Sequence, residues 1–223
     1  MRTLVIDCAT EACSVALFDG AALLAGDWQL LGRGHAEALV PMVAALPEKG
    51  RADRIAVSLG PGSFTGLRVG LAAARALGLA WNCPVLGYPT LALVAAQALE
   101  VSKAEDVLVC MTGGHGEWFV QGFDRNFVTT APLSSLAPAQ AAATHQQSLI
   151  AGTKAGELVA LRGHGEALAI HPDARSFALL DPALLTTDIA LIYGRAPDAQ
   201  LPEQRPKPEQ RGGRTGQVAG QAA

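Results

Sequence analysis

Hydrophobic positions near the start of the chain fall into short, strand-like runs. Residues 4–6 and 13–18 are compact apolar runs, the turn pair Asp19-Gly20 closes the second, and a third run follows at 21–30. Asp-Gly favours a tight hairpin, and connections this short leave no room for the crossover helix that parallel strands need. The pattern therefore predicts a three-stranded antiparallel meander and excludes a dinucleotide-binding Rossmann fold.

Helical spacing follows the meander. Residues 36–46 place apolar side chains three and four positions apart, and residues 64–81 are rich in alanine and leucine. A compact strand at 55–59 separates these two helices, and a further strand at 84–88 and a helix at 90–99 lead away from the unit. The predicted order is strand, strand, strand, helix, strand, helix.

The second half of the chain repeats this order more weakly. The corresponding elements are strands at 107–111, 117–123 and 127–130, a helix at 138–145, a strand at 149–151 and a closing helix at 174–180. A repeated unit of this kind predicts an α/β protein with a duplicated ribonuclease-H-like fold, in two small domains with mixed sheets. Actin-like ATPases (the ASKHA group), sugar kinases and Hsp70 chaperones share this architecture.

Length and composition divide the chain into three parts. Its 223 residues can build two modest cores. We expect an N-terminal actin-like domain over 1–100 and a smaller C-terminal actin-like domain over 101–201. Residues 202–223 are rich in Arg, Pro, Gln and Gly and carry more basic than acidic side chains, so we expect a disordered tail. A solvated tail and a tail that contacts RNA both remain open.

Charge and hydropathy exclude several classes of protein. Only 17% of residues are charged and the formal net charge is -3, so no general positive field draws the chain onto nucleic-acid phosphates. The longest apolar stretch, 67–81, is interrupted by Arg68 and Arg75, whereas a membrane span needs roughly 20 largely uncharged residues. The N-terminus enters a strand without the basic start of a secretory signal. We therefore expect a cytoplasmic chain without membrane contact, and reduced thiols at its four cysteines.

The glycine-rich segment 60–70 turns a strand into a helix and has two interpretations. Free N–H groups at the helix start favour a phosphate, which Asp7 and Thr10 at the end of the first strand would help to hold. Alternatively, Ser63 or Thr65 caps the helix and the glycines let it lie against the sheet. No lysine follows as in a Walker A loop. The predicted vestigial phosphate site comprises Asp7, Thr10, Gly62, Ser63, Thr65 and Gly66.

Complete catalytic sets are missing from the sequence. His35 and Glu37 have no second histidine four residues later to form a helical metal pair. No G-x-S-x-G elbow exposes a serine nucleophile. We therefore predict no catalytic residue, no metal ligand and no enzymatic activity of the chain's own.

The predicted helix over 64–81 is apolar on nearly every side. Its two charges, Arg68 and Arg75, are seven residues apart and lie on one side. A helix on its own sheet needs only one apolar stripe, so this one is buried against something more, either a partner protein or a second domain. The predicted partner interface comprises Leu39, Met42, Val43, Leu46, Leu67, Arg68, Leu71, Arg75 and Leu77.

Three segments, 7–17, 34–37 and 60–70, together resemble the TsaB family, formerly called YeaZ. The likeness covers about residues 1–202 and includes the segment 193–199 near the C-terminus. The chain departs from the family pattern where Cys8 and Ala9 replace a Thr-Ser pair after the first strand. Residues 112–119 also replace an Asp-Ala-Arg-Arg-Gly-Glu-Val-Tyr type segment.

The resemblance implies a non-catalytic subunit of the machinery that forms N6-threonylcarbamoyladenosine in tRNA beside the anticodon. It implies pairing through the N-terminal domain with a TsaD-type transferase, a TsaE-type ATPase as a further partner, and a homodimer through the same surface. No intrinsic cofactor is expected, ATP or ADP would bind only within the assembled complex, and tRNA would be contacted mainly through that complex. The alternative is a small actin-like ATPase or sugar-kinase-like phosphotransferase; a glycoprotease-type (M22) metallopeptidase lacks its metal ligands.

Overall fold

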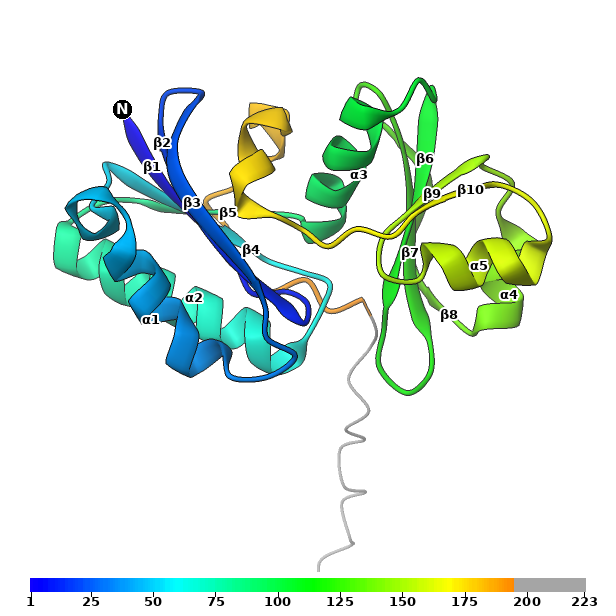
Figure 1. Ribbon diagram of the computed structural model, residues 1–223, viewed down its shortest axis with the longest axis horizontal. Coiled ribbons are helices and arrows are strands. Elements are labelled where there is room, and N and C mark those ends of the chain that lie inside the picture. Colours follow the sequence, from blue (N-terminus) through cyan, green and yellow to red (C-terminus); the bar gives the residue numbers. More distant parts are fainter. Residues whose placement is uncertain (195–223) are drawn as a thin grey trace, which may run out of the picture.

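The computed structural model describes residues 1–194, so the predicted tail at 202–223 lies outside the described residues. Two five-stranded sheets form the body of the molecule (Figure 1). Each sheet has helices on its outer side, and one helix lies between the two sheets. Two domains of this kind are what the duplicated pattern predicts.

The first sheet has the strand order β3-β2-β1-β4-β5. Its strands are β1 (Arg2–Asp7), β2 (Ala12–Asp19), β3 (Ala22–Leu30), β4 (Arg54–Ser58) and β5 (Val85–Tyr88). Strands β1 to β3 form the predicted antiparallel meander, while β4 and β5 are parallel to β1. Helices α1 (His35–Ala45) and α2 (Phe64–Trp81) lie side by side on the outer face, and a short 3₁₀ turn, η1 (Pro47–Gly50), follows α1.

The second sheet repeats this topology. Its strands are β6 (Asp106–Thr112), β7 (Trp118–Asp124), β8 (Thr129–Leu136), β9 (Leu149–Ala151) and β10 (Glu166–Leu168). The order β8-β7-β6-β9-β10 mirrors the first sheet, again with three antiparallel strands followed by two parallel ones. Helices α4 (Pro138–Thr144) and α5 (Ala155–Arg162) occupy the places of α1 and α2. The duplicated ribonuclease-H-like fold is confirmed.

One predicted element of the second unit is wrong. The helix expected at 174–180 is a 3₁₀ helix, η2 (Ala174–Leu179), and it packs on the first sheet and on α3. The true closing helix is α5, which the sequence analysis missed along with β10. Only Ala155 and Leu158 of α5 are buried, so its apolar signal is too weak to stand out.

Helix α3 (Thr90–Val101) lies between the sheets and unites their cores. Leu91, Leu93 and Val94 are fully buried, on different sides of the helix. One continuous apolar cluster includes these residues together with Val5 of the first sheet and Val109 of the second. The two domains therefore share a core through α3.

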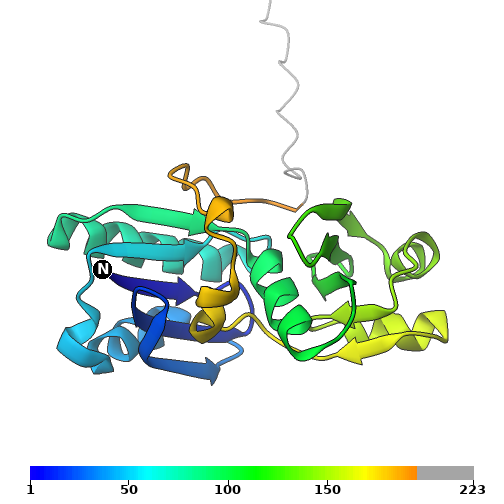
Figure 2. The same cartoon turned by 90° about the horizontal axis from the view of Figure 1, so that it is seen from above.

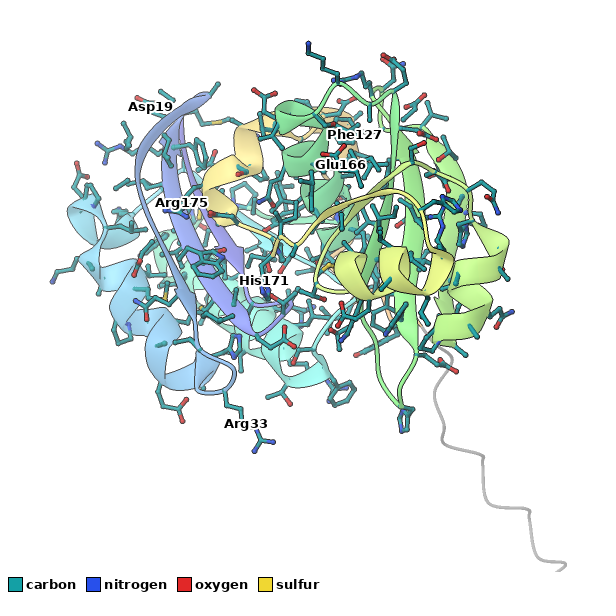
Figure 3. All side chains as sticks on the ribbon, turned by 45° about the vertical axis from the view of Figure 1, so that its right-hand side comes forward. Asp19, Arg33, Phe127, Glu166, His171 and Arg175 are labelled. Atoms are coloured by element: carbon teal, nitrogen blue, oxygen red, sulfur yellow. The ribbon has the colours of Figure 1, made fainter. Side chains whose placement is uncertain are left out.

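After the second sheet the chain returns to the first. We call residues 171–194 the returning segment; it contains η2 and a second 3₁₀ turn, η3 (Pro182–Leu184). Ala174 donates its N–H to Ser14 Oγ at 2.9 Å, and Ile192 donates its N–H to the Leu59 carbonyl at 2.8 Å. Figure 2 shows this segment lying over the first domain. Figure 3 labels Arg175 and His171, the residues by which the segment comes close to β3. The predicted C-terminal domain, 101–201, thus contains a stretch that packs on the N-terminal one.

Among residues 1–194, no helix combines the length and the apolar character that crossing a membrane requires.

Candidate functional site

The glycine-led turn before α2 ends in a capped helix. Ser63 Oγ accepts a hydrogen bond from the Gly66 N–H at 3.2 Å, which satisfies one of the free donors of the first turn. Ser63 itself donates its N–H to the Ala9 carbonyl at 2.7 Å. The capping interpretation of Ser63 is confirmed, and the turn is attached to the end of the first strand.

Glycines allow α2 to pack directly on backbone. A Cβ at Gly62 would overlap the Ala9 carbonyl oxygen, and a Cβ at Gly66 would overlap the carbonyl oxygen of Cys8. One turn later, a Cβ at Gly70 would come within 3.6 Å of Cys8 Sγ. Close approach to the sheet therefore accounts for Gly62 and Gly66 without a phosphate, whereas Gly70 has room for a Cβ.

Asp7 at the end of β1 is enclosed. Its side chain is 1% exposed, and its carboxylate accepts hydrogen bonds from the Ala9 N–H and the Tyr88 hydroxyl, both at 2.9 Å. Burial raises the pKa of Asp7 to about 6, although both hydrogen bonds act in the opposite direction. Asp7, the acid predicted to help bind a phosphate, is instead buried and hydrogen-bonded to the Tyr88 hydroxyl.

A cleft of about 700 Å³ separates the two domains. Turns from both domains line it: residues 9–11 and 61–64 on one side, 111–115 on the other, and 192–194 of the returning segment at the edge. The volume falls within the range of small-molecule sites. Of the predicted vestigial phosphate site, Thr10, Gly62 and Ser63 line this cleft, whereas Asp7, Thr65 and Gly66 do not.

The cleft carries few charges and several aromatic rings. Glu11 and Arg68 are its only acidic and guanidinium side chains among the described lining residues. The Arg68 guanidinium lies 3.5 Å from the centre of the Phe64 ring, and Nη2 donates to the Tyr193 hydroxyl at 3.4 Å. Arg68 is therefore already engaged by neighbouring rings.

His35 serves the structure of the turn. It is buried, and its Nε2 donates to the Thr10 carbonyl at 2.9 Å. The described part of the chain contains no cluster of three or more His, Cys, Asp or Glu side chains arranged to hold a metal ion. His35 instead joins the start of α1 to the turn that follows β1.

Most residues of the predicted partner interface are covered by the chain itself. Most large apolar side chains of α1 and of the first half of α2 pack against the first sheet, whereas Val40 and Phe64 are exposed. Leu39, Met42, Val43, Leu46, Leu67 and Leu71 are buried, Leu77 is half-buried, and Arg68 and Arg75 are exposed. Of the nine, only the two arginines and part of Leu77 offer surface to another protein.

A different set of residues forms the outer surface of these helices. We call it the α1–α2 face: Ala36, Val40 and Ala44 of α1, and Ala72, Ala76 and Leu79 of α2, all exposed. Leu79 is 87% exposed and Val40 is 64% exposed. These six side chains are apolar, and the exposed Arg68 and Arg75 lie on the same helix as the three from α2.

Comparison with known proteins gives consistent matches. The family described as TsaD, tRNA N6-adenosine threonylcarbamoyltransferase, matches residues 29–167. The tRNA threonylcarbamoyladenosine biosynthesis protein TsaB of Escherichia coli (strain K12) is 37% identical over 131 residues, 56% of each chain. TsaB of Haemophilus influenzae is 36% identical over 120 residues, 50% of this chain and 49% of that one.

A solved structure extends the likeness to nearly the whole described chain. YeaZ from Pseudomonas aeruginosa superposes with a TM-score of 0.73 at 27% identity, covering 86% of this chain and 99% of that one. The chain belongs to the TsaD family, in its TsaB (YeaZ) group. It matches only about half the length of its curated TsaB relatives.

Within this TsaB-type fold, sequence reasoning missed two parts of the cleft. The ring centres of Phe64 and Tyr193 lie 6.1 Å apart, although the two residues are far apart in the sequence. The hairpin turn with Gly113 and Gly114 faces the first-domain turn across the cleft. Its position as the counterpart of the Asp7 to Ala12 turn in the repeat was the signal that could have identified it.

Proposed function

We propose that the chain is a non-catalytic subunit that supports formation of N6-threonylcarbamoyladenosine in tRNA by pairing with a TsaD-type transferase. Its membership of the TsaB group supports the pathway, since the E. coli relative is named as a biosynthesis protein for this nucleoside. The observation that carries the pairing is the exposed, apolar α1–α2 face.

The composition of this face suits a protein partner. Covering a leucine as exposed as Leu79 removes enough apolar surface from water to contribute about 2 kcal/mol. The alanines around it allow the partner's backbone to approach closely, as helices with small side chains pack at short interaxial distances. Arg68 and Arg75 supply charged groups at the border of the face, and arginine is one of the residue types enriched at binding hot spots.

The burial of Asp7 favours a non-catalytic, supporting role for this chain rather than a catalytic one. A carboxylate that accepts from Tyr88 and from the backbone, and that does not line the cleft, is poorly placed to bind a metal ion or activate a water molecule. The chemistry of transfer is therefore assigned to the partner. We further propose that a second copy of the chain uses the same face when the transferase is missing.

Other partners belong to the assembled complex in this proposal. A TsaE-type ATPase would join the pair of subunits, ATP or ADP would bind only in that assembly, and tRNA would be contacted mainly through it. The low charge of the chain supports this division, because a net charge of -3 provides no general attraction for tRNA phosphates.

Reconstitution tests the proposal. The transferase is incubated with tRNA, threonylcarbamoyl donor and the remaining subunits, with and without this chain, and modified nucleoside is quantified by mass spectrometry. We expect a stable complex on size exclusion and loss of modification when the chain is omitted. Equal modification without it would refute the supporting role.

The alternative, a small ATPase or phosphotransferase, rests on the volume of the interdomain cleft. Calorimetric titration of the isolated chain with magnesium-ATP distinguishes the two. Tight binding by the chain alone would favour the alternative, whereas the absence of binding heat would support a non-catalytic subunit in which Asp7 does not line the cleft.

A further inference from the structure

Two cysteines face each other at the end of the β1–β2 hairpin. The register that pairs Ile6 with Val15 and Asp7 with Ser14 continues to Cys8 opposite Cys13, and their Sγ atoms are 3.6 Å apart. Opposed residues on antiparallel strands have Cα atoms about 4.5 to 5.5 Å apart, within the roughly 4.4 to 6.8 Å that disulfides span. The sulfurs, 3.6 Å apart, therefore need to approach by only a small distance to reach the roughly 2.05 Å of a disulfide bond.

Both thiols are buried on the side of the sheet that faces α1 and α2. Each is 0% exposed and belongs to the apolar cluster that lies between the first sheet and helices α1 and α2. The hydrogen bond between the two sulfurs lowers the pKa of the Cys13 thiol and raises the pKa of the Cys8 thiol. Cys13 is the member of the pair that becomes a thiolate more readily, and the thiolate is the nucleophilic form.

We propose that Cys8 and Cys13 are an oxidation site at which hydrogen peroxide forms a reversible disulfide. The Cys13 thiolate attacks a peroxide oxygen, the O–O bond breaks, and the departing hydroxide takes a proton to leave as water. The Cys8 sulfur then attacks the Cys13 sulfenic acid, the S–O bond breaks, and a second water leaves with the Cys8 proton. Two thiols are oxidised to one disulfide, and one peroxide is reduced to two waters.

The location of the pair links the disulfide to the rest of the site. Residues 9–11, between the cysteines, line the interdomain cleft, so the cleft is the side from which peroxide would reach the two sulfurs. His35 at the start of α1 and Ser63 before α2 are both hydrogen-bonded to this turn. A Cys8–Cys13 bond closes a short ring around it and thereby constrains the starts of both helices.

The other two cysteines provide internal controls. Cys83 is half-exposed in the loop after α2, where peroxide reaches it directly. Cys110 is buried in β6 of the second sheet, and burial raises the pKa of its thiol to about 12. Cys110 therefore stays protonated and unreactive, and Cys83 reports the oxidant dose.

Peptide mapping tests the proposal on the full chain. The protein is treated with hydrogen peroxide, alkylated in denaturant and cleaved by a glutamate-specific protease, which cuts after Glu11, between the two cysteines. We expect Cys8 and Cys13 to be lost from the titratable thiols. We also expect the fragment ending at Glu11 to stay joined to the one beginning at Ala12 until reductant is added. Fragments that separate without reductant, at a dose that modifies Cys83, would overturn the proposal.

Substitutions assign the two roles. In Cys8→Ala the Cys13 sulfenic acid has no thiol to attack it, so trapping by dimedone should increase several-fold over the native chain. Cys13→Ser should abolish the joined fragments and leave no dimedone adduct on the fragment that carries Cys8. The variant Cys83→Ser, which leaves the pair intact, should still form the joined fragments. Equal dimedone trapping in the native chain and Cys8→Ala would contradict the assignment.

Discussion

Helices α2 and α3 are both strongly apolar, but only α3 is buried all round by its own chain. Nine of the 12 residues of α3 are buried, because it lies between two sheets. In α2, six of 18 are buried and three of those are glycines, so it meets its sheet largely through backbone and leaves an apolar side open. The same apolar pattern therefore occurs on a helix that its own chain buries on all sides and on one that its own chain leaves open on one side.

The largest expected effect comes from removing packing in α3. Leu93 is fully buried, so Leu93→Ala should lower the free energy of unfolding by about 2 to 5 kcal/mol. The matched change Leu79→Ala, at the exposed position of α2, should cost less than about 0.5 kcal/mol. Urea denaturation of the isolated chain measures both. Similar losses for the two would remove the contrast between these helices.

The second effect concerns the acid on the α3 side of the first sheet. In the folded chain the pKa of Asp7 is about 6, so its side chain stays largely protonated between pH 4 and 6. In the unfolded chain the pKa of Asp7 is near 3.8, so its side chain is mostly ionised over the same range. Stability should therefore fall as pH rises through this window, by up to about 3 kcal/mol, since one pKa unit corresponds to about 1.4 kcal/mol.

Asp7→Asn provides the control for this pH dependence. The amide does not titrate, so the fall in unfolding free energy between pH 4 and 6 should shrink. Urea midpoints for both proteins across pH 4 to 7 test this. Parallel pH curves for the two proteins would contradict the assignment of this pH dependence to Asp7.

A third, smaller effect tests the backbone contact of α2. A Cβ at Gly66 overlaps the Cys8 carbonyl, so Gly66→Ala should cost about 1 to 3 kcal/mol by pushing α2 away from β1. Gly156 in α5 has open space around its Cβ position, so Gly156→Ala should stabilise by about 0.4 to 1 kcal/mol. Thermal unfolding compares them. A neutral Gly66→Ala would show that α2 does not depend on this close approach.

The sequence predicted the first domain well because its signals are local. The Asp19-Gly20 turn and the short runs around it specify the meander, and Ser63 occupies the cap of α2 as expected. The element at 174–180 was wrong because its three-residue apolar spacing fits an α-helix and a 3₁₀ helix alike. Its place is decided by contacts such as the bond from Ala174 to Ser14, which are remote in sequence.

The partner surface was harder to predict than the fold. Large apolar residues at helical spacing, such as Leu39 and Leu71, look like an interface, but the first sheet itself needs them as core. The exposed side carries mostly alanines, whose sequence signal is weak. The sequence shows that α2 is apolar on several sides. The structure is needed to show that Leu79 lies on the side that no other part of the described chain covers.

The central claim is that the open side of α2 binds the transferase. The most direct measurement is the affinity of the TsaD-type transferase for Leu79→Glu, beside the control Leu161→Glu, at a 56% exposed position on α5 of the other domain. Both variants should keep unfolding free energies within about 0.5 kcal/mol of the native chain. We predict that Leu79→Glu weakens binding at least tenfold and that Leu161→Glu does not; equal, native-like affinity for the two variants would contradict the account.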